Sequence, residues 1–150
     1  QGDDLRNEFD HIAACVKHFA AYGAPVGGRD YNTVNMSERE LRDMYLPAYR
    51  AALDAGAKTV MTSFNTVDGI PSTGNKHLLR DILRGEWGFD GVVISDFAAI
   101  AELVAHGVAG DDADAAKLAI EAGVDIDMMS VAYQRQLKNL VASGKVRESL

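Results

Sequence analysis

The sequence predicts an α/β fold made of repeated strand–helix units. Four apolar, strand-like runs begin near Ile12, Lys58, Gly91 and Val124, at spacings of 46, 33 and 33 residues. A helical pattern, with apolar residues at three- and four-residue steps, follows each run. Runs rich in Val and Ile without polar alternation are typical of parallel strands that are buried on both faces. Their alternation with helices therefore predicts a parallel sheet covered by helices.

Start and stop signals mark the predicted helices. Ser37 and Glu40 form a capping box before an apolar pattern that ends at Gly56. Pro47 lies inside this pattern and predicts a kink or two shorter helices, because proline removes a backbone donor. Further helices are expected after Asn75, from Asp111-Asp112 to Gly123, from Tyr133 to Gly144, and as a short helical turn over residues 98–105.

Composition excludes several classes of function. The 22 acidic residues outnumber the 15 Lys and Arg, the net charge is −7, and no basic cluster occurs, which argues against binding to nucleic acid or to an anionic membrane. No run approaches the roughly 20 apolar residues of a membrane span. The single cysteine, Cys15, excludes an internal disulfide framework. We expect neither a metal nor an organic cofactor.

Polar residues follow the predicted strands at their carboxyl ends. Lys17-His18 follows the first strand, Ser63-Phe64-Asn65 the second and Ser95-Asp96 the third. In a parallel barrel these ends share one face, where α/β enzymes place their catalytic groups. A lysine, a histidine and a carboxylate that converge there could bind a polyhydroxylated ligand, since the lysine donates hydrogen bonds and the carboxylate accepts them.

Asp96 is the most informative of these residues, and two roles are open for it. It emerges where a buried strand meets its loop, a position suited to catalysis, but it could equally cap a helix that starts near Ala98. Two further carboxylates, Asp125 and Asp127, could suggest a divalent cation. Because alternate strand positions point to opposite faces, we expect a structural role for them.

Five segments, in order along the chain, resemble the glycoside hydrolase family 3 β-glucosidases over almost all 150 residues. They are Val16-Lys17-His18-Phe19-Ala20-Ala21-Tyr22-Gly23, Gly28-Arg29-Asp30-Tyr31-Asn32, Val60-Met61-Thr62-Ser63-Phe64-Asn65 through Gly69-Ile70-Pro71, Trp87-Gly88-Phe89-Asp90-Gly91 through Ile94-Ser95-Asp96-Phe97, and Ala122-Gly123-Val124-Asp125-Ile126-Asp127-Met128.

The resemblance implies an exo-acting, retaining β-glucosidase. Asp96 matches the nucleophile, which attacks the anomeric carbon and forms a glycosyl-enzyme that water then hydrolyses. The other matching positions bind or line the sugar subsite: Lys17, His18, Arg29, Met61, Phe64 and Phe97. Phe64 and Phe97 stand where family members often have Tyr and Trp. The substrate implied is a β-linked oligosaccharide or an aryl or alkyl glucoside.

The resemblance also implies a larger protein. Four βα units correspond to the C-terminal half, about strands 5 to 8, of a TIM-type (β/α)8 barrel, so residues 1–150 would be part of the N-terminal barrel domain. The general acid/base usually lies in a second domain beyond Leu150. Many relatives are periplasmic or secreted, and we expect such a location here. Two alternatives stay open: an inactive carbohydrate-binding remnant of the barrel, or another α/β enzyme with a phosphorylated Asp96.

Overall fold

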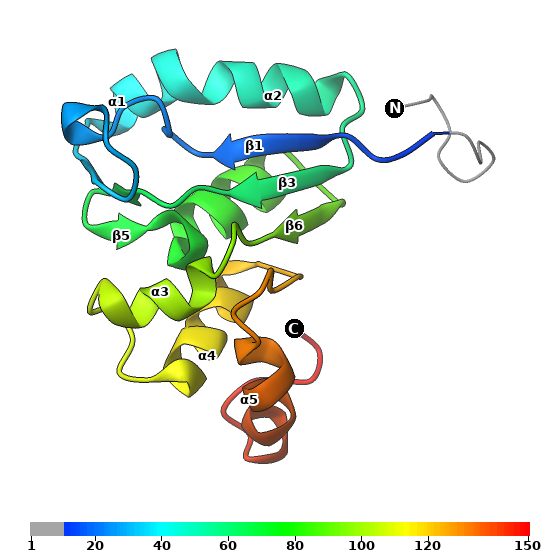
Figure 1. Cartoon of the computed structure of the whole chain (residues 1–150). Coiled ribbons are helices and arrows are strands. Elements are labelled where there is room, and N and C mark those ends of the chain that lie inside the picture. Colours follow the sequence, from blue (N-terminus) through cyan, green and yellow to red (C-terminus); the bar gives the residue numbers. More distant parts are fainter. Residues whose placement is uncertain (1–10) are drawn as a thin grey trace.

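The computed structural model describes residues 11–150, and at its centre is a parallel sheet. Its three strands are β1 (Cys15–Phe19), β3 (Thr59–Thr62) and β6 (Val92–Ile94), in the order β1–β3–β6. Helices follow the strands along the chain, and α2 runs beside β1 (Figure 1). The predicted α/β class with a parallel sheet is confirmed.

The fourth predicted strand is reduced to one parallel bridge, between Ile94 and Ile126. The Asp125 side chain accepts a hydrogen bond from the Val93 amide at 2.7 Å, and Val93 O accepts from the amides of both Asp125 and Ile126. The Asp125 side chain thus accepts from the Val93 amide, which in a longer strand would donate to a backbone carbonyl. The pairing therefore remains short, although its position beside β6 is as expected.

The helices begin and end close to the predicted signals. They are α1 (Glu38–Glu40), the π-helix η2 (Leu41–Tyr45), α2 (Leu46–Asp54), the π-helix η4 (His77–Glu86), α3 (Ala99–Ala105), α4 (Asp112–Ala122) and α5 (Ala132–Ala142). Ser37 Oγ accepts a hydrogen bond from the Glu40 amide, and Asp111 caps α4. The interruption predicted at Pro47 is present, because the wide turns of η2 end where proline enters the first turn of α2.

A second, smaller sheet was not predicted. It consists of β2 (Thr33–Val34), β4 (Thr66–Val67) and β5 (Ile70–Pro71), in which β2 and β4 are parallel and β4 and β5 antiparallel. The β4–β5 turn is Asp68-Gly69, and both residues have positive φ, 49° and 84°. This is the Asp-Gly signal of a tight hairpin. Short 3₁₀ turns, η1 (Val26–Gly28) and η3 (Ser72–Gly74), precede β2 and follow β5.

The core lies against one face of the parallel sheet. Along β3 the side chains alternate, with Val60 and Thr62 buried while Thr59 and Met61 stay partly exposed. The buried side chains of this face share one core cluster with η4 and α4, which contribute many fully buried side chains: Leu78, Leu79, Ile82, Leu83, Ala115, Ala116 and Ala119. The strands come close at Gly91, where a Cβ atom would lie 2.3 Å from Lys58 O.

An ion-pair network joins η4 to α1 and η2. His77 Nε2 lies 3.2 Å from Glu38 Oε1, and its Nδ1 lies 3.3 Å from Asp81 Oδ2. Arg42 makes a two-fold contact with Glu86 at 2.7 and 2.8 Å. Burial lowers the pKa of His77, but the two carboxylate partners outweigh burial, and the net effect raises its pKa.

The protein should therefore gain stability from His77 at low pH. A raised pKa in the folded state means that the contribution is complete below the ordinary histidine pKa and is lost as pH rises through the raised value. We expect His77→Ala to lower the free energy of unfolding near pH 5 by less than about 1 kcal/mol, because the pair is exposed, and to have a smaller effect near pH 9.

Urea unfolding at both pH values measures this difference. His106→Ala is the control, because burial lowers the pKa of His106, so its pH trend should be the reverse. An equal loss for His77→Ala at the two pH values would show that the charge of His77 contributes nothing.

Candidate active site

Asp96 lies at the carboxyl end of β6, in a loop fixed by the backbone around it. The Ser95 amide donates to Ile126 O at 2.9 Å, and Ser95 Oγ accepts from the Met128 amide at 2.9 Å. The Ala98 amide donates to Met128 O at 2.8 Å. These bonds tie the loop on both sides of Asp96 to the segment that follows the neighbouring bridge.

The carboxylate of Asp96 is buried and only half satisfied. The residue is 7% exposed; Oδ1 accepts a hydrogen bond from the Phe97 amide at 2.7 Å, whereas Oδ2 accepts none within the described part of the chain. The helix-capping alternative for Asp96 is wrong, because α3 begins after Ala98 and has no side-chain cap. A buried carboxylate oxygen without a partner is costly unless a ligand uses it.

His18 faces this free oxygen. Its Nε2 lies 3.2 Å from Asp96 Oδ2, within ion-pair distance but without the alignment of a hydrogen bond. Burial lowers the pKa of His18, Asp96 opposes this, Lys17 adds to the lowering, and the net shift is downward. His18 is therefore neutral at neutral pH, with one ring nitrogen able to donate a hydrogen bond and the other able to accept one.

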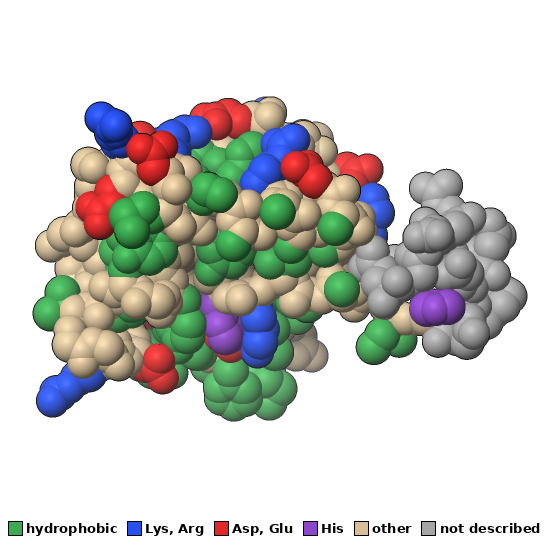
Figure 2. Space-filling view, turned by 90° about the horizontal axis from the view of Figure 1, so that it is seen from above, with side chains coloured by type: hydrophobic (Ala, Val, Ile, Leu, Met, Phe, Trp, Pro, Cys, Tyr) green, Lys and Arg blue, Asp and Glu red, His purple; other side chains and the backbone are tan. Residues whose placement is uncertain are grey.

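Two of the other predicted site residues, Lys17 and Met61, lie on strands of the sheet, and two more, Phe97 and Arg29, lie in loops. Lys17 is exposed on β1 and close enough to His18 for its charge to act there, and Met61 pairs with Ile94, two residues before Asp96. On the face seen in Figure 2, one histidine lies next to a Lys or Arg side chain. Phe97 is 58% exposed, and Arg29 lies exposed just after η1.

Phe64 belongs to a row of rings that starts at His18. The His18 and Tyr22 ring centroids are 4.6 Å apart, those of Tyr22 and Phe64 6.4 Å, and those of Phe64 and Tyr31 4.4 Å. The Tyr22 hydroxyl donates to Asp30 Oδ1 at 2.6 Å. Tyr22 and Tyr31 were not predicted as site residues; each lies in a matched segment, but only the fold places their rings together.

Buried polar groups hold the chain on both sides of Phe64. Ser63 Oγ donates to Ala20 O at 3.1 Å, and Asn65 Nδ2 donates to the same carbonyl at 3.2 Å. The Ser63 amide donates to Phe19 O. These bonds fix the segment that leaves β1 against the end of β3, so the predicted polar residues Ser63 and Asn65 position the site and do not face a ligand.

The expected structural role of Asp125 and Asp127 agrees with their contacts. Asp125 Oδ2 accepts from Arg84 Nη2 at 2.6 Å, and Asp127 accepts from the amides of Ser130 and Tyr133. Among residues 11–150, no group of three or more His, Cys, Asp or Glu side chains is placed to hold a metal ion.

Glu102 is a second carboxylate near Asp96 that sequence reasoning missed. It lies on α3, and its Oε2 is buried without a hydrogen-bond partner among residues 11–150. Burial raises the pKa of Glu102, and the charge of Asp96 raises it further. No sequence signal could have marked it, because an acidic residue in a helix is normally solvated.

Replacing Glu102 with Gln should therefore stabilise the protein at neutral pH. A raised carboxyl pKa means that the ionised form destabilises the fold, and the penalty disappears as pH falls and the group is protonated. Relative to the unchanged protein, Glu102→Gln should melt at a higher temperature near pH 7, and the gap should close near pH 4. Thermal unfolding across this range measures it, with the exposed Glu148→Gln as control. A lower melting temperature at neutral pH would contradict the prediction.

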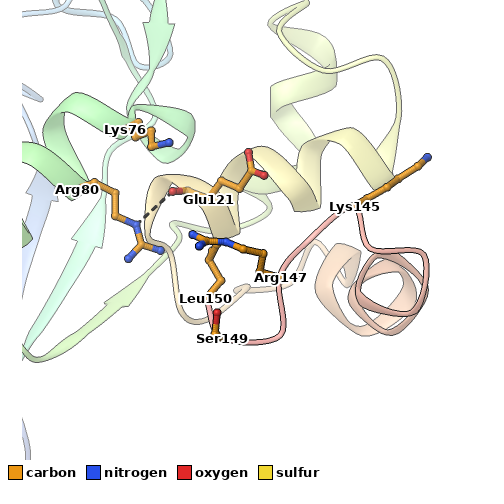
Figure 3. Close-up of a pocket in the computed structure, with 7 residues that line it drawn as sticks. All are labelled: Lys76, Arg80, Glu121, Lys145, Arg147, Ser149 and Leu150. Atoms are coloured by element: carbon orange, nitrogen blue, oxygen red, sulfur yellow. Dashed lines mark hydrogen bonds between the residues drawn. The ribbon is translucent and has the colours of Figure 1, made fainter.

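A pocket of about 440 Å³ lies apart from these residues (Figure 3). Its lining comes from the residue before η4, from η4 and α4, and from the chain after α5: Lys76, Arg80, Glu121, Lys145, Arg147, Ser149 and Leu150. The Arg80 guanidinium already donates to the carbonyl oxygens of Ile120 and Glu121 at 3.1 and 3.2 Å, and so satisfies the C-terminal end of α4. None of the predicted site residues lines this pocket.

The family model for the glycosyl hydrolase family 3 N terminal domain matches residues 3–150. The chain belongs to this family. A periplasmic beta-glucosidase of Salmonella typhimurium is 50% identical over 135 residues, which are 90% of this chain and 18% of that protein. A putative beta-xylosidase of Formosa agariphila is 37% identical over 142 residues, 93% of this chain and 19% of that protein.

Solved structures of the family agree with the fold. The beta-glucosidase from Listeria innocua in complex with glucose matches with a TM-score of 0.90 and 60% identity, over 92% of this chain and 19% of that one. A β-glucosidase from Erythrobacter marinus matches with a TM-score of 0.88 and 38% identity, over 95% and 19%. The chain thus spans about a fifth of the length of these family 3 relatives. Within the described residues, no helix is both long and apolar enough to span a membrane.

Proposed function

We propose that this chain supplies the nucleophile and part of the sugar subsite of a retaining, exo-acting β-glucosidase. The observation that carries the proposal is the buried Asp96 carboxylate, whose free Oδ2 lies beside His18 at the carboxyl end of the sheet. The substrate would be a β-linked oligosaccharide or an aryl or alkyl glucoside. The relatives named as β-glucosidases and β-xylosidases support this substrate class.

In the proposed reaction, Asp96 Oδ2 attacks the anomeric carbon of the terminal sugar. The bond to the leaving-group oxygen breaks as the glycosyl-enzyme bond forms, and a water molecule later displaces Asp96 with net retention. Lys17 donates a hydrogen bond to the sugar hydroxyls, and neutral His18 can donate one and accept one. Arg29, Met61, Phe64 and Phe97 would line the subsite.

A second carboxyl group must protonate the leaving oxygen, and we propose that it lies outside these 150 residues. Retaining glycosidases use two carboxyl groups about 5 to 5.5 Å apart. We propose further that residues 1–150 form the C-terminal half, about strands 5 to 8, of a TIM-type barrel. On this reading the partly exposed face of the sheet, with Thr59, Met61 and Val92, turns toward the barrel interior, and the other barrel half and a second domain belong to the same polypeptide. A periplasmic or secreted location is also proposed, supported by the Salmonella relative.

The product anomer tests the mechanism directly. The complete polypeptide that carries this chain, given an aryl β-glucoside, should release β-glucose first, as followed by NMR before mutarotation. Release of α-glucose would contradict a nucleophilic Asp96. An aryl β-xyloside assayed in parallel separates the two activities named among the relatives.

Two further outcomes bear on the alternatives. The 150-residue chain alone should hydrolyse these substrates barely or not at all. Turnover close to that of the complete polypeptide would refute the proposal that the carboxyl group protonating the leaving oxygen lies outside these residues. A complete polypeptide that binds β-glucosides without hydrolysing them would favour the inactive carbohydrate-binding remnant.

A further inference from the structure

The ring row of His18, Tyr22, Phe64 and Tyr31 runs from the buried nucleophile to the surface. It begins with His18 beside Asp96 and ends with Tyr31, which is 46% exposed. The two middle rings, Tyr22 and Phe64, are partly buried. The outermost ring therefore has a packed inner side, on Phe64, and a free outer face.

The fold places Tyr31 on Phe64 by strand register. Thr33 of β2 pairs in parallel with Thr66 of β4, and Tyr31 and Phe64 each stand two residues before these partners. Parallel pairing therefore brings two rings together that are 33 residues apart in sequence. Their planes are tilted by 38° at a centroid distance of 4.4 Å.

The backbone of Tyr31 is held in an unfavourable conformation. Its φ is 64°, in the left-handed region that non-glycine residues rarely adopt. The next residue, Asn32, fixes the loop, since its Nδ2 donates to Val26 O at 2.8 Å and its Oδ1 accepts from the Thr33 amide at 2.8 Å. Strain that the surroundings maintain in this way occurs preferentially at ligand sites.

Three carboxylates act electrostatically on the Tyr31 hydroxyl. Burial raises the pKa of Tyr31, and the charges of Glu102, Asp30 and Asp96 raise it further, so Tyr31 lies on the same side of the molecule as these carboxylates. An aromatic face next to hydrogen-bond acceptors matches the two surfaces of a sugar ring, one of C–H groups and one of hydroxyls.

We propose that the exposed face of Tyr31 is a stacking platform for the sugar ring on the leaving-group side of the scissile bond. Tyr31 is then a specificity-determining residue, which raises kcat/KM for substrates that carry a second sugar. Its place at the outer end of the row, beyond the ring that packs beside His18, assigns it to the outer sugar and not to the sugar attacked by Asp96. The inference rests on the proposed β-glucosidase function.

The test compares substrates with and without a second ring. In the complete polypeptide, kcat/KM is measured for β-glucosyl fluoride, whose leaving group is one atom, and for the best-accepted member of a panel of β-1,2-, β-1,3-, β-1,4- and β-1,6-linked glucose disaccharides. Tyr31→Ala should lower kcat/KM about tenfold or more for the disaccharide and leave it within about twofold for the fluoride. Turnover of the fluoride also reports correct folding.

Two variants separate the ring from its hydroxyl and its backbone. Tyr31→Phe keeps the ring and should retain disaccharide hydrolysis, whereas Tyr31→Gly relaxes the left-handed backbone but should lose it as Tyr31→Ala does. The platform would be overturned if Tyr31→Ala affected both substrates equally or affected neither. It would also be overturned if the unchanged protein hydrolysed the fluoride but no disaccharide. An unchanged protein that hydrolyses neither substrate would instead refute the proposed function.

Discussion

Asp96→Asn is expected to lower kcat/KM for β-glucosides by on the order of 10⁴-fold or more, as loss of a catalytic nucleophile does in other covalent mechanisms. An amide oxygen is a poor nucleophile, while the shape and the hydrogen bond from the Phe97 amide can be kept. The fold should survive, because Oδ2 carries no hydrogen bond in the described part of the molecule. Steady-state kinetics with the complete polypeptide measures the loss.

A control on the same strand–loop unit makes the effect specific. Asp90 precedes β6 at its opposite end, and its side chain is solvent-exposed with one long ion pair to Lys58 at 3.8 Å. Asp90→Asn should leave kcat/KM within about twofold. A 2-fluoro glucoside should then label Asp96 covalently in the unchanged polypeptide, as read by peptide mass spectrometry. A label on a different carboxylate would refute the assignment.

The strand–helix order could be predicted because local signals and tertiary packing agree. Gly91 followed by Val92, Val93 and Ile94 gives both the parallel strand, of which only Val93 is buried, and the close approach to Lys58 that a side chain at 91 would block. At Asp125 they disagree, since a side chain takes the Val93 amide and shortens the fourth strand to a bridge. The Asp68-Gly69 hairpin carried a usable turn signal, but β4 and β5 are only two residues each, too short to show alternation.

Only some residues of the candidate site could be predicted from the sequence. Lys17, His18 and Asp96 could be named from the segments they stand in, and the structure brings the latter two within 3.2 Å. Tyr31 and Glu102 could not, because neither has a pattern of its own. Tyr31 reaches the row through the pairing of β2 with β4, and Glu102 through the direction in which α3 leaves the Asp96 loop.

Lys17→Ala and His18→Ala should each lower kcat/KM by on the order of 10- to 1000-fold, a loss of roughly 1.4 to 4 kcal/mol of transition-state stabilisation. His18 Nε2 lies 3.2 Å from Asp96 Oδ2, and Lys17 is its neighbour on β1. In the proposed reaction both donate to sugar hydroxyls, and such hydrogen bonds strengthen as the transition state forms. His106→Ala is the matched control for His18, since His106 is also partly buried but lies beyond α3. Unchanged kcat/KM values for Lys17→Ala and His18→Ala would show that these two residues do not bind the substrate.

The pH dependence distinguishes a neutral His18 from a charged one. Because burial outweighs the attraction of Asp96 and lowers the pKa of His18, the ring is neutral through the neutral range and acts by hydrogen bonding. The loss in His18→Ala should therefore be similar near pH 7 and near pH 8, and His18→Asn, which keeps one donor, should recover part of it. If His18 instead acted as a cation paired with Asp96, the loss would shrink as pH rises and the unchanged protein loses that charge.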